Sequence, residues 1–209
     1  MDLSAIYLDV LKDRLYCSSP DSPLRRSAQT ALHRLARMLA TAMAPLLPFT
    51  ADEVWDFLPG ATPGRVHLET FDLLPDVPED DAADAVFARL LDLRDEILKE
   101  LEIHRQAGEF GKSLEAEVVL GGDLGGLDSD LASCRTTLEE LCIVSQVTGG
   151  EGSRASQVYP GLSVGVRRVE GTTCPRCWQV WPKPAGHASH PELCARCLDV
   201  VLGLEKQSR

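Results

Sequence analysis

Apolar residues recur with helical spacing through much of this chain. Residues 2–16, 23–43 and 82–106 each place apolar side chains at positions i, i+3, i+4 and i+7. That spacing gives a helix one apolar face and one polar face. Short connections between the early helices favour an antiparallel helical bundle. The hydrophobic pattern therefore predicts a mainly α fold.

Capping residues and prolines set the predicted ends of these helices. Ser22 and Pro23 provide a favourable N-cap and first position for the second helix. Thr50 and Glu53 have capping-box spacing, which predicts a short third helix from Thr50. Pro59 begins the proline-rich segment that ends this helix.

The period changes after Gly108, where apolar runs become short and alternate with turn residues. This pattern predicts a small α/β unit followed by a strand and a closing helix. The predicted strands are Ser113–Leu120, Cys142–Val147 and Ser163–Val169, with a short one at Val66–Leu68; the predicted helices are Leu127–Leu141 and 191–204; and the predicted turn is 121–126.

These elements divide the chain into four predicted segments. A helical bundle occupies residues 1–58 and a linker occupies 59–81. A helix with a small α/β junction subdomain follows at 82–150, and a four-cysteine zinc finger at 151–209 closes the chain.

Charge is distributed unevenly along the sequence. The net charge of −11 argues against a nucleic-acid partner, but most of the acid lies in residues 59–150, which hold seven basic and twenty acidic side chains. Residues 1–58 are nearly balanced, with six against seven, and residues 151–209 hold eight against five. The footprint for a polyanion is weak. With no apolar run of membrane-spanning length and no signal sequence, we expect a cytoplasmic protein.

Four cysteines carry the strongest chemical signal. Cys174 and Cys177 form one C-x2-C knuckle, Cys194 and Cys197 form another, and sixteen residues separate the two. This spacing predicts one structural zinc ion in a closed shell of four thiolates. The alternative is four ordinary thiols.

Two histidines are the alternative metal ligands, and three cysteines lie outside the knuckles. If one knuckle did not ligate, His187 and His190 would be the substitutes, because they lie between the knuckles. Otherwise they belong to an exposed loop. The remaining cysteines, Cys17, Cys134 and Cys142, are expected to be small buried hydrophobes.

No grouping of residues indicates catalysis. Gly111-Lys112-Ser113 resembles the end of a phosphate-binding loop, but it lacks the earlier glycine and leads into a strand. Trp178 and Trp181 are of more interest, because Arg176 and Arg196 lie in the same two knuckles. An exposed indole beside arginines is a platform for stacking an unpaired base. The alternative is that both indoles cover the core of a small metal module.

The whole chain resembles the C-terminal region of bacterial isoleucyl-tRNA synthetases. The segments that carry the resemblance are Asp2–Tyr16, Arg25–Thr30, Ala44–Trp55, Gly111–Ala116, Leu141–Val147, Cys174–Trp178 and His190–Cys197. The helical part alone would also fit valyl or leucyl relatives. Its combination with this zinc finger indicates the isoleucyl family.

The resemblance implies a role in tRNA recognition. In that family the bundle and the zinc region bind the anticodon stem and loop of isoleucine tRNA, and the position of Trp178 corresponds to a residue that stacks on an anticodon base. Arg176 and Arg196 are candidates for RNA contacts because they accompany the indoles in the two knuckles. Candidate phosphate contacts on the first two helices are Lys12, Arg14, Arg25, Arg26, Arg34 and Arg37.

The departure from the family is equally informative. The HIGH and KMSKS motifs of the catalytic domain, which attaches isoleucine to tRNA with ATP, are not in this sequence. We therefore expect a fragment, a truncated gene product or one piece of a split gene, with the catalytic domain as a partner. The alternatives are a free-standing tRNA-binding module and a zinc-stabilised scaffold without an RNA role. A glycosylase-like repair enzyme is disfavoured, because the chain does not start with the catalytic proline of that class.

Overall fold

The computed structural model describes residues 3–71, 80–122 and 128–207, with the backbone alone for 128–134. The chain forms two compact units. One, the helical unit, is Ser19–Asp80; the other, the composite unit, combines Met1–Ser18 with Asp81–Arg209. The first helical segment therefore clusters with residues far along the chain, whereas the sequence grouped it with residues 19–58.

The helical unit contains two helices and one short turn of helix. Its elements are α3 (Pro23–Met43), α4 (Pro48–Asp56) and the 3-10 helix η2 (Val66–Leu68). Together they enclose a small buried cluster of Ala40, Ala44, Ala51, Trp55 and Val66. Trp55 is 1% exposed and donates a hydrogen bond from its Nε1 to the Thr62 carbonyl at 3.1 Å. One large ring among small residues thus supplies most of this core.

Two sequence predictions for the helical unit were wrong. The third helix begins at Pro48 and has no side-chain cap, so Thr50 lies inside it. Proline is favoured at the first helical position because its missing N–H is not needed there. The predicted strand at Val66–Leu68 is a 3-10 helix, which buries Val66 against the Trp55 cluster. The start of α3 at Pro23 is confirmed, although the Ser22 side chain does not cap it.

The composite unit begins with a broken helical segment, not the single helix that periodicity predicts. It consists of a π-helix, η1 (Leu3–Tyr7), followed by α1 (Leu8–Val10) and α2 (Lys12–Cys17). Leu11, at the junction of α1 and α2, is 3% exposed. Within α2, Cys17 is the only residue that is fully buried.

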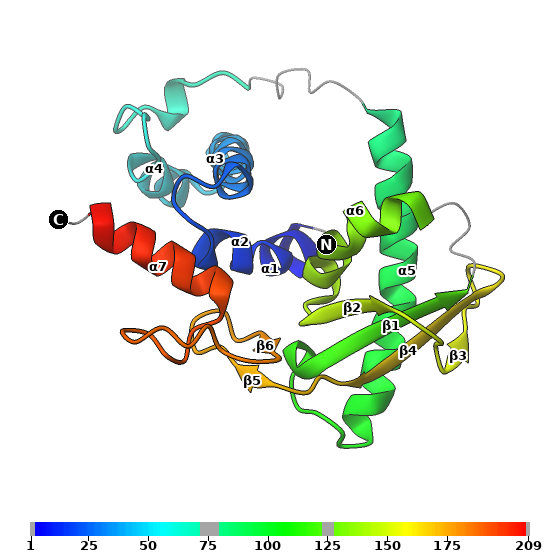
Figure 1. Ribbon diagram of the computed structural model, residues 1–209. Helices are drawn as coiled ribbons and strands as arrows, with labels where there is room; N and C mark the ends of the chain where they lie inside the picture. Colours follow the sequence, from blue (N-terminus) through cyan, green and yellow to red (C-terminus); the bar gives the residue numbers. More distant parts are fainter. Residues whose placement is uncertain (1–2, 72–79, 123–127, 208–209) are drawn as a thin grey trace. The chain divides into compact units, whose positions relative to one another are not determined.

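A long helix and a small mixed sheet form the main core of the composite unit. Figure 1 shows α5 (Asp81–Gln106) lying across the sheet formed by β1 (Ala116–Gly122), β2 (Gln146–Gly149), β3 (Arg154–Ala155) and β4 (Leu162–Arg168). Helix α6 (Asp128–Cys142) leads into β2. The apolar face predicted for α5 is confirmed, because Leu90, Leu93, Ile97 and Leu101 are all buried.

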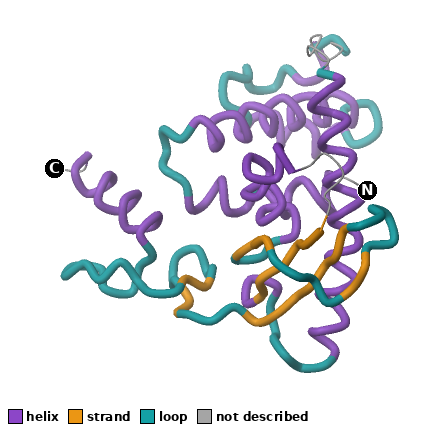
Figure 2. Tube along the Cα trace, turned by 45° about the vertical axis from the view of Figure 1, so that its right-hand side comes forward, coloured by secondary structure: helices purple, strands orange, loops and turns teal. Residues whose placement is uncertain are grey.

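The sheet order is β2-β1-β4-β3. Strand β1 pairs parallel with β2 and antiparallel with β4, and β3 pairs antiparallel with β4. Figure 2 draws the strands of the molecule in orange. The strand predicted from Ser113 starts only at Ala116, after the 3-10 helix η3 (Ser113–Glu115). The strand predicted from Cys142 starts only at Gln146, because Cys142 still belongs to α6. Of the predicted turn at 121–126, residues 123–127 lie outside the described residues.

The chain ends in a small hairpin and a helix. Strands β5 (Thr172–Thr173) and β6 (Val180–Trp181) pair antiparallel, and α7 (Ala195–Gln207) forms most of the closing helix that the sequence predicts. Helices predominate over strands, and a cluster of four cysteines lies in this last part. Across the described ranges, no helix has the length and apolar character needed to cross a membrane.

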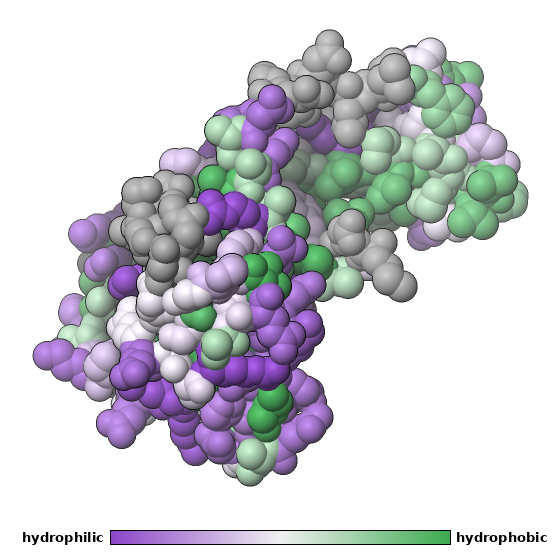
Figure 3. Space-filling model, turned by 90° about the vertical axis from the view of Figure 1, so that its right-hand side faces the viewer, coloured by the Kyte–Doolittle hydropathy of each residue, from purple (hydrophilic) through white to green (hydrophobic). Residues whose placement is uncertain are grey.

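Hydrophobic side chains are spread unevenly over the surface, as one face of the molecule shows (Figure 3). Several of the most exposed large apolar side chains belong to the helical unit. They include Leu46, Phe49, Phe57 and Leu68, of which Phe49 is 90% exposed.

Candidate metal centre and nucleic-acid interface

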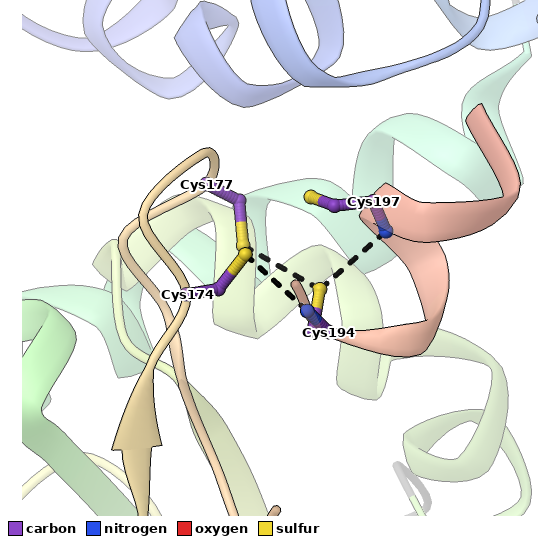
Figure 4. Close-up of side chains that lie close together, drawn as sticks. All are labelled: Cys174, Cys177, Cys194 and Cys197. Atoms are coloured by element: carbon purple, nitrogen blue, oxygen red, sulfur yellow. Dashed lines mark hydrogen bonds between the residues drawn. The ribbon is translucent and has the colours of Figure 1, made fainter. Parts of the chain in front are cut away.

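The four knuckle cysteines come together from two parts of the last sixty residues. Cys174 and Cys177 lie in the turn between β5 and β6, whereas Cys194 and Cys197 lie at the start of α7. Their four Sγ atoms are all within 4.8 Å of one another, and all four residues are buried (Figure 4). The prediction that these thiols converge is confirmed.

Their spacing fits one metal ion. Bonds of about 2.3 Å from zinc to sulfur place neighbouring sulfurs of a tetrahedral shell about 3.8 Å apart. The Sγ atoms of Cys177 and Cys194 are 3.9 Å apart. Four thiolates at such separations can hold a metal ion, and they leave no coordination position for water.

Backbone amides point at these sulfurs and favour their charged form. The Cys194 amide donates to Cys174 Sγ, and the Cys197 amide donates to Cys194 Sγ, each at 3.5 Å. The second of these amides belongs to the first turn of α7, where the helix dipole stabilises negative charge. A hydrogen bond from the Cys197 thiol lowers the pKa of Cys177, whereas the same contact raises the pKa of Cys197 and burial raises that of Cys194. The protein alone therefore favours one thiolate, and a bound cation would favour the thiolate form of the others.

The two histidines between the knuckles are engaged elsewhere. Their rings stack with centroids 6.4 Å apart, and His190 Nε2 lies 2.9 Å from a carboxylate oxygen of Glu205. Among the described residues, the four cysteines are the group whose ligand atoms converge, and neither His187 nor His190 belongs to it.

A fifth thiol borders the cluster without joining it. Cys17, at the end of α2, packs against the knuckle cysteines and donates from Sγ to the Arg176 carbonyl at 3.6 Å. Burial raises the pKa of Cys17 to about 11, so it remains a protonated thiol at neutral pH. Cys142 is also buried, as predicted, whereas the side chain of Cys134 lies outside the described residues.

Both knuckle arginines contact protein groups of the first helical segment. Arg196 forms two hydrogen bonds with the Asp13 carboxylate, at 2.5 and 2.8 Å. Arg176 donates to the Cys17 carbonyl at 2.6 Å, to the Tyr16 carbonyl at 3.3 Å and to Cys197 Sγ at 3.6 Å. These contacts compete with the RNA contacts that the sequence suggested for the same two residues.

Trp178, in contrast, presents its ring to solvent. It is 59% exposed although it directly follows a knuckle cysteine. Its backbone has a φ of 64°, a left-handed conformation that costs energy for a residue other than glycine. The Trp178 amide donates to the Cys174 carbonyl at 2.8 Å, which fixes this turn. Lys112 Nζ lies 5.0 Å from the ring centroid, within range of a cation–π interaction.

Trp181 fits the alternative reading of the two tryptophans. It is partly buried and packs against the cysteine cluster together with Leu198 and Val201. One indole of the pair therefore covers the small module, and the other remains available for a ligand.

A recess of about 400 Å³ opens beside Trp178. The first helical segment contributes one wall, including Tyr16, and the first knuckle contributes another, including Arg176. Ile143 also lines it and has a φ of 55°, an uncommon backbone conformation for a β-branched residue. Strained residues of this kind often cluster at binding sites.

The basic residues predicted on the first two helices divide into several groups. Lys12 pairs with Asp9 and Arg14 pairs with Glu140, both within the composite unit. In the helical unit, Arg37 lies over the Trp55 ring at 4.4 Å and 3.5 Å from Glu69.

The other three predicted phosphate contacts are arginines of α3. Arg26 is paired only at 3.7 Å, with Asp21, and both side chains are largely exposed. Arg34 is exposed and Arg25 is half-buried.

Sequence reasoning did not identify Lys112, Asp13 or Ile143 as neighbours of the knuckles. Asp13 is separated from Arg196 by 183 residues, and Lys112 is remote in sequence from Trp178. No local pattern connects such positions. The signal available was that all three residues lie in segments that share the family resemblance.

The sequence of nearly the whole chain is similar to that of known proteins. A model of the anticodon-binding domain of tRNA ligases matches residues 1–120. Isoleucine–tRNA ligase from Syntrophotalea carbinolica is 39% identical over 96% of this chain. The corresponding ligases from Nitratidesulfovibrio vulgaris strain DP4 and Brevibacillus brevis are 41% and 39% identical over 97% and 96%.

In each case the match covers 22% of the relative, so the chain spans about a fifth of the length of these ligases. The family model covers more than half of the chain and includes the helical unit, the first helical segment and α5. The chain therefore belongs to the anticodon-binding domain family of tRNA ligases.

Proposed function

We propose that this chain binds the anticodon stem and loop of isoleucine tRNA and carries one structural zinc ion. The observation that carries the proposal is the exposed ring of Trp178, held on a turn between converging thiols. Stacking of a nucleic-acid base on an aromatic ring contributes about 1–3 kcal/mol. The names of the relatives indicate which tRNA is bound.

The recess beside Trp178 suits a base better than a phosphate. Asp9, Asp13, Glu139 and Glu140 all line it. Lys12 and Arg176 also line it, but both already bind protein acceptors. The carboxylate oxygens can accept hydrogen bonds from the amino groups of bases, whereas they offer a phosphate no donor. A base that leaves the anticodon stack can therefore enter with its face against the indole.

The best candidates for phosphate contacts are basic side chains that bind few acceptor groups of the protein itself. Arg26 and Arg34 on α3 are exposed, and Lys112 lies beside the Trp178 ring. Each phosphate neutralised by such a residue releases counterions and makes binding depend on salt. We assign a smaller part to Arg176 and Arg196, whose guanidinium groups already bind protein acceptors.

Zinc is the metal that best fits the donor set. Four thiolates in a closed tetrahedral shell are typical of structural zinc sites. The ion supplies folding energy to the hairpin and to the start of α7, and the surrounding residues exclude water from it. The residues that hold it are Cys174, Cys177, Cys194 and Cys197.

Ligation of isoleucine to tRNA is the activity in the names of the relatives, of whose length this chain spans about a fifth. We propose that the remaining part of such an enzyme supplies the catalytic domain, either joined to this chain or as a separate partner. This chain contributes recognition of the tRNA.

The direct test is binding of the zinc-loaded chain to isoleucine tRNA and to the same tRNA with an exchanged anticodon, at two salt concentrations. We expect tighter binding to the native anticodon. Trp178→Ala should weaken that binding by about 10- to 100-fold, the equivalent of a lost base stack. Trp178→Phe keeps an aromatic face and serves as the matched control.

Two results would contradict this proposal. Equal affinity for both anticodons would mean that this chain does not read the anticodon on its own. Unchanged affinity in Trp178→Ala would remove the indole from the interface. A circular dichroism spectrum of each variant separates these results from loss of folding.

A further inference from the structure

The two knuckle arginines connect the metal site to the first helical segment. Arg176 lies between Cys174 and Cys177, and Arg196 lies between Cys194 and Cys197. Both side chains reach α2, although that helix is about 160–180 residues away in sequence. Each knuckle therefore contributes one contact to the same helix.

The contact from the second knuckle is a bidentate ion pair. Both terminal nitrogens of Arg196 bind the Asp13 carboxylate, and the two side chains are 36% and 26% exposed. A fork-shaped pair of this kind fixes orientation as well as distance. It therefore sets the rotation of α2 relative to the start of α7.

The contact from the first knuckle caps the end of α2. The last carbonyls of a helix lack partners within the helix, and Arg176 donates to those of Tyr16 and Cys17. The same guanidinium donates to Cys197 Sγ at 3.6 Å. One side chain therefore joins a metal-ligating sulfur to the last turn of α2.

Apolar and polar contacts share the docking of α2. Leu11, which directly precedes the helix, and Cys17, at its end, are buried. Arg14 adds one ion pair with Glu140 on α6. The knuckle arginines bind the side of the helix at Asp13 and its last turn, so they fix its orientation in addition to this burial.

We propose that Arg176 and Arg196 are positioning residues that transmit occupancy of the metal site to α2 and thereby set the width of the Trp178 recess. Asp13 and Tyr16 lie on one wall of the recess, and Arg176 and Trp178 lie on another. When the metal holds the two knuckles, the arginines hold these walls at a fixed separation. This inference rests on the metal part of the proposed function and not on tRNA binding.

Thermodynamic linkage gives the proposal a reciprocal consequence. If metal binding tightens the docking of α2, then a change that weakens the docking must weaken metal binding by the same factor. Couplings between sites are commonly about 5- to 150-fold. For a half-exposed ion pair we expect the lower end of that range, about 5- to 10-fold.

The experiment is hydrogen–deuterium exchange of peptides covering residues 8–18 and 172–199, together with zinc affinity measured by competition with a chelator. Removal of zinc from the native chain should speed exchange in both peptides. Zinc-loaded Asp13→Asn should speed exchange in the 8–18 peptide by about 5- to 10-fold and leave the 172–199 peptide protected. Its zinc affinity should fall by a similar factor.

Two further variants serve as controls. Asp13→Glu keeps a carboxylate and should restore much of the protection. Asp9→Asn removes the same charge from the exposed pair with Lys12 on the same segment, and zinc affinity should stay within about twofold of the native value.

The proposal is overturned if the 8–18 peptide exchanges equally fast with and without zinc, or if Asp13→Asn leaves both exchange and zinc affinity unchanged. A native chain that binds no zinc at all contradicts the metal assignment itself. Because the readout contains no RNA, failure of the anticodon experiment leaves this result unaffected.

Discussion

The helical unit and the cysteine-rich end of the composite unit both have small cores, but different chemistry stabilises each core. The helical unit gathers alanines and Val66 around the indole of Trp55. The other region gathers Cys17, four knuckle cysteines and Leu193. A core of alanines and one ring depends on close fit, whereas with the zinc ion that we propose, the core of thiols depends on an ion that binds their charged form.

This difference predicts two kinds of vulnerability. A packed ring fails when its volume is removed, because the cavity cannot collapse completely. A metal-centred core fails when a ligand is removed, because the remaining thiolates lose the ion that balances them. Each region should therefore be insensitive to the change that destroys the other.

The largest effect is expected from loss of a metal ligand. Cys194→Ser should reduce metal affinity by more than the roughly 10- to 100-fold caused by changes to the partners of metal ligands. Order should be lost from about residue 172 onward, because apart from the four sulfurs the hairpin and α7 share only a small apolar contact of Trp181 with Leu198 and Val201. Metal content by mass spectrometry and hydrogen exchange of residues 172–199 measure the two results.

Cys17→Ser is the matched control for this experiment. Cys17 packs beside the cluster but lies outside the group of converging ligands. It should keep full metal content, and the helical unit should be unaffected in both variants. Equal loss of metal from Cys17→Ser and Cys194→Ser would contradict the assignment of four ligands.

The next largest effect is expected in the helical unit. Trp55→Ala should destabilise it by about 3–5 kcal/mol, since the ring is fully buried and its Nε1 hydrogen bond to Thr62 is also lost. Urea unfolding of the helical unit, followed by circular dichroism, measures this change. Metal content should stay at its native value.

Trp178→Ala provides the comparison, because it removes the same side chain from an exposed position. We expect less than about 1 kcal/mol from that substitution. A similar loss in both variants would mean that burial of Trp55 is not what holds the helical unit together.

The smallest effect is expected at an ion pair in the sheet. This ion pair involves neither the metal site nor the packing of a large buried side chain. Hydrogen bonds from Arg167 hold the pKa of Glu117 below its ordinary value. The pKa of this carboxyl is about 4.3 in the unfolded chain and lower in the folded chain. The ion pair therefore stabilises the fold fully above about pH 4.3, and this stabilisation is lost as the pH falls through the folded-state pKa. Glu117→Gln should therefore flatten the acid side of the stability curve.

Unfolding midpoints measured between pH 7 and pH 2 test this expectation. The native chain should lose part of its stability below about pH 4.3, whereas the variant should lose less over the same interval. An identical pH dependence in both proteins would mean that this pair does not contribute.

Local signals in the sequence predicted the parts of the molecule that local physics determines. The apolar spacing of α5 placed Leu93 and Ile97 in the core, and the C-x2-C pairs brought their own sulfurs together. The start of α4 was predicted wrongly because a capping box and a first-turn proline competed within three residues, and the proline prevailed.

Contacts between distant segments could not be predicted in this way. Val66 forms a 3-10 helix because it packs on Trp55, although its own sequence favours a strand. The pairing of Asp13 with Arg196 depends on the complete fold of the composite unit. The sequence shows which side chains are charged, but it does not show which of them form ion pairs.

The interrupted course of the composite unit has a consequence for the order in which the chain folds during its synthesis. The helical unit is continuous in sequence, so all of its residues are available once Asp80 has been made. Asp13 must wait for Arg196, which is 183 residues later. At ribosomal rates of about 5–20 residues per second, that delay is roughly 10–40 seconds. For most of it, α2 lacks both of its arginine partners, and the helical unit is complete before this helix of the other unit can be secured.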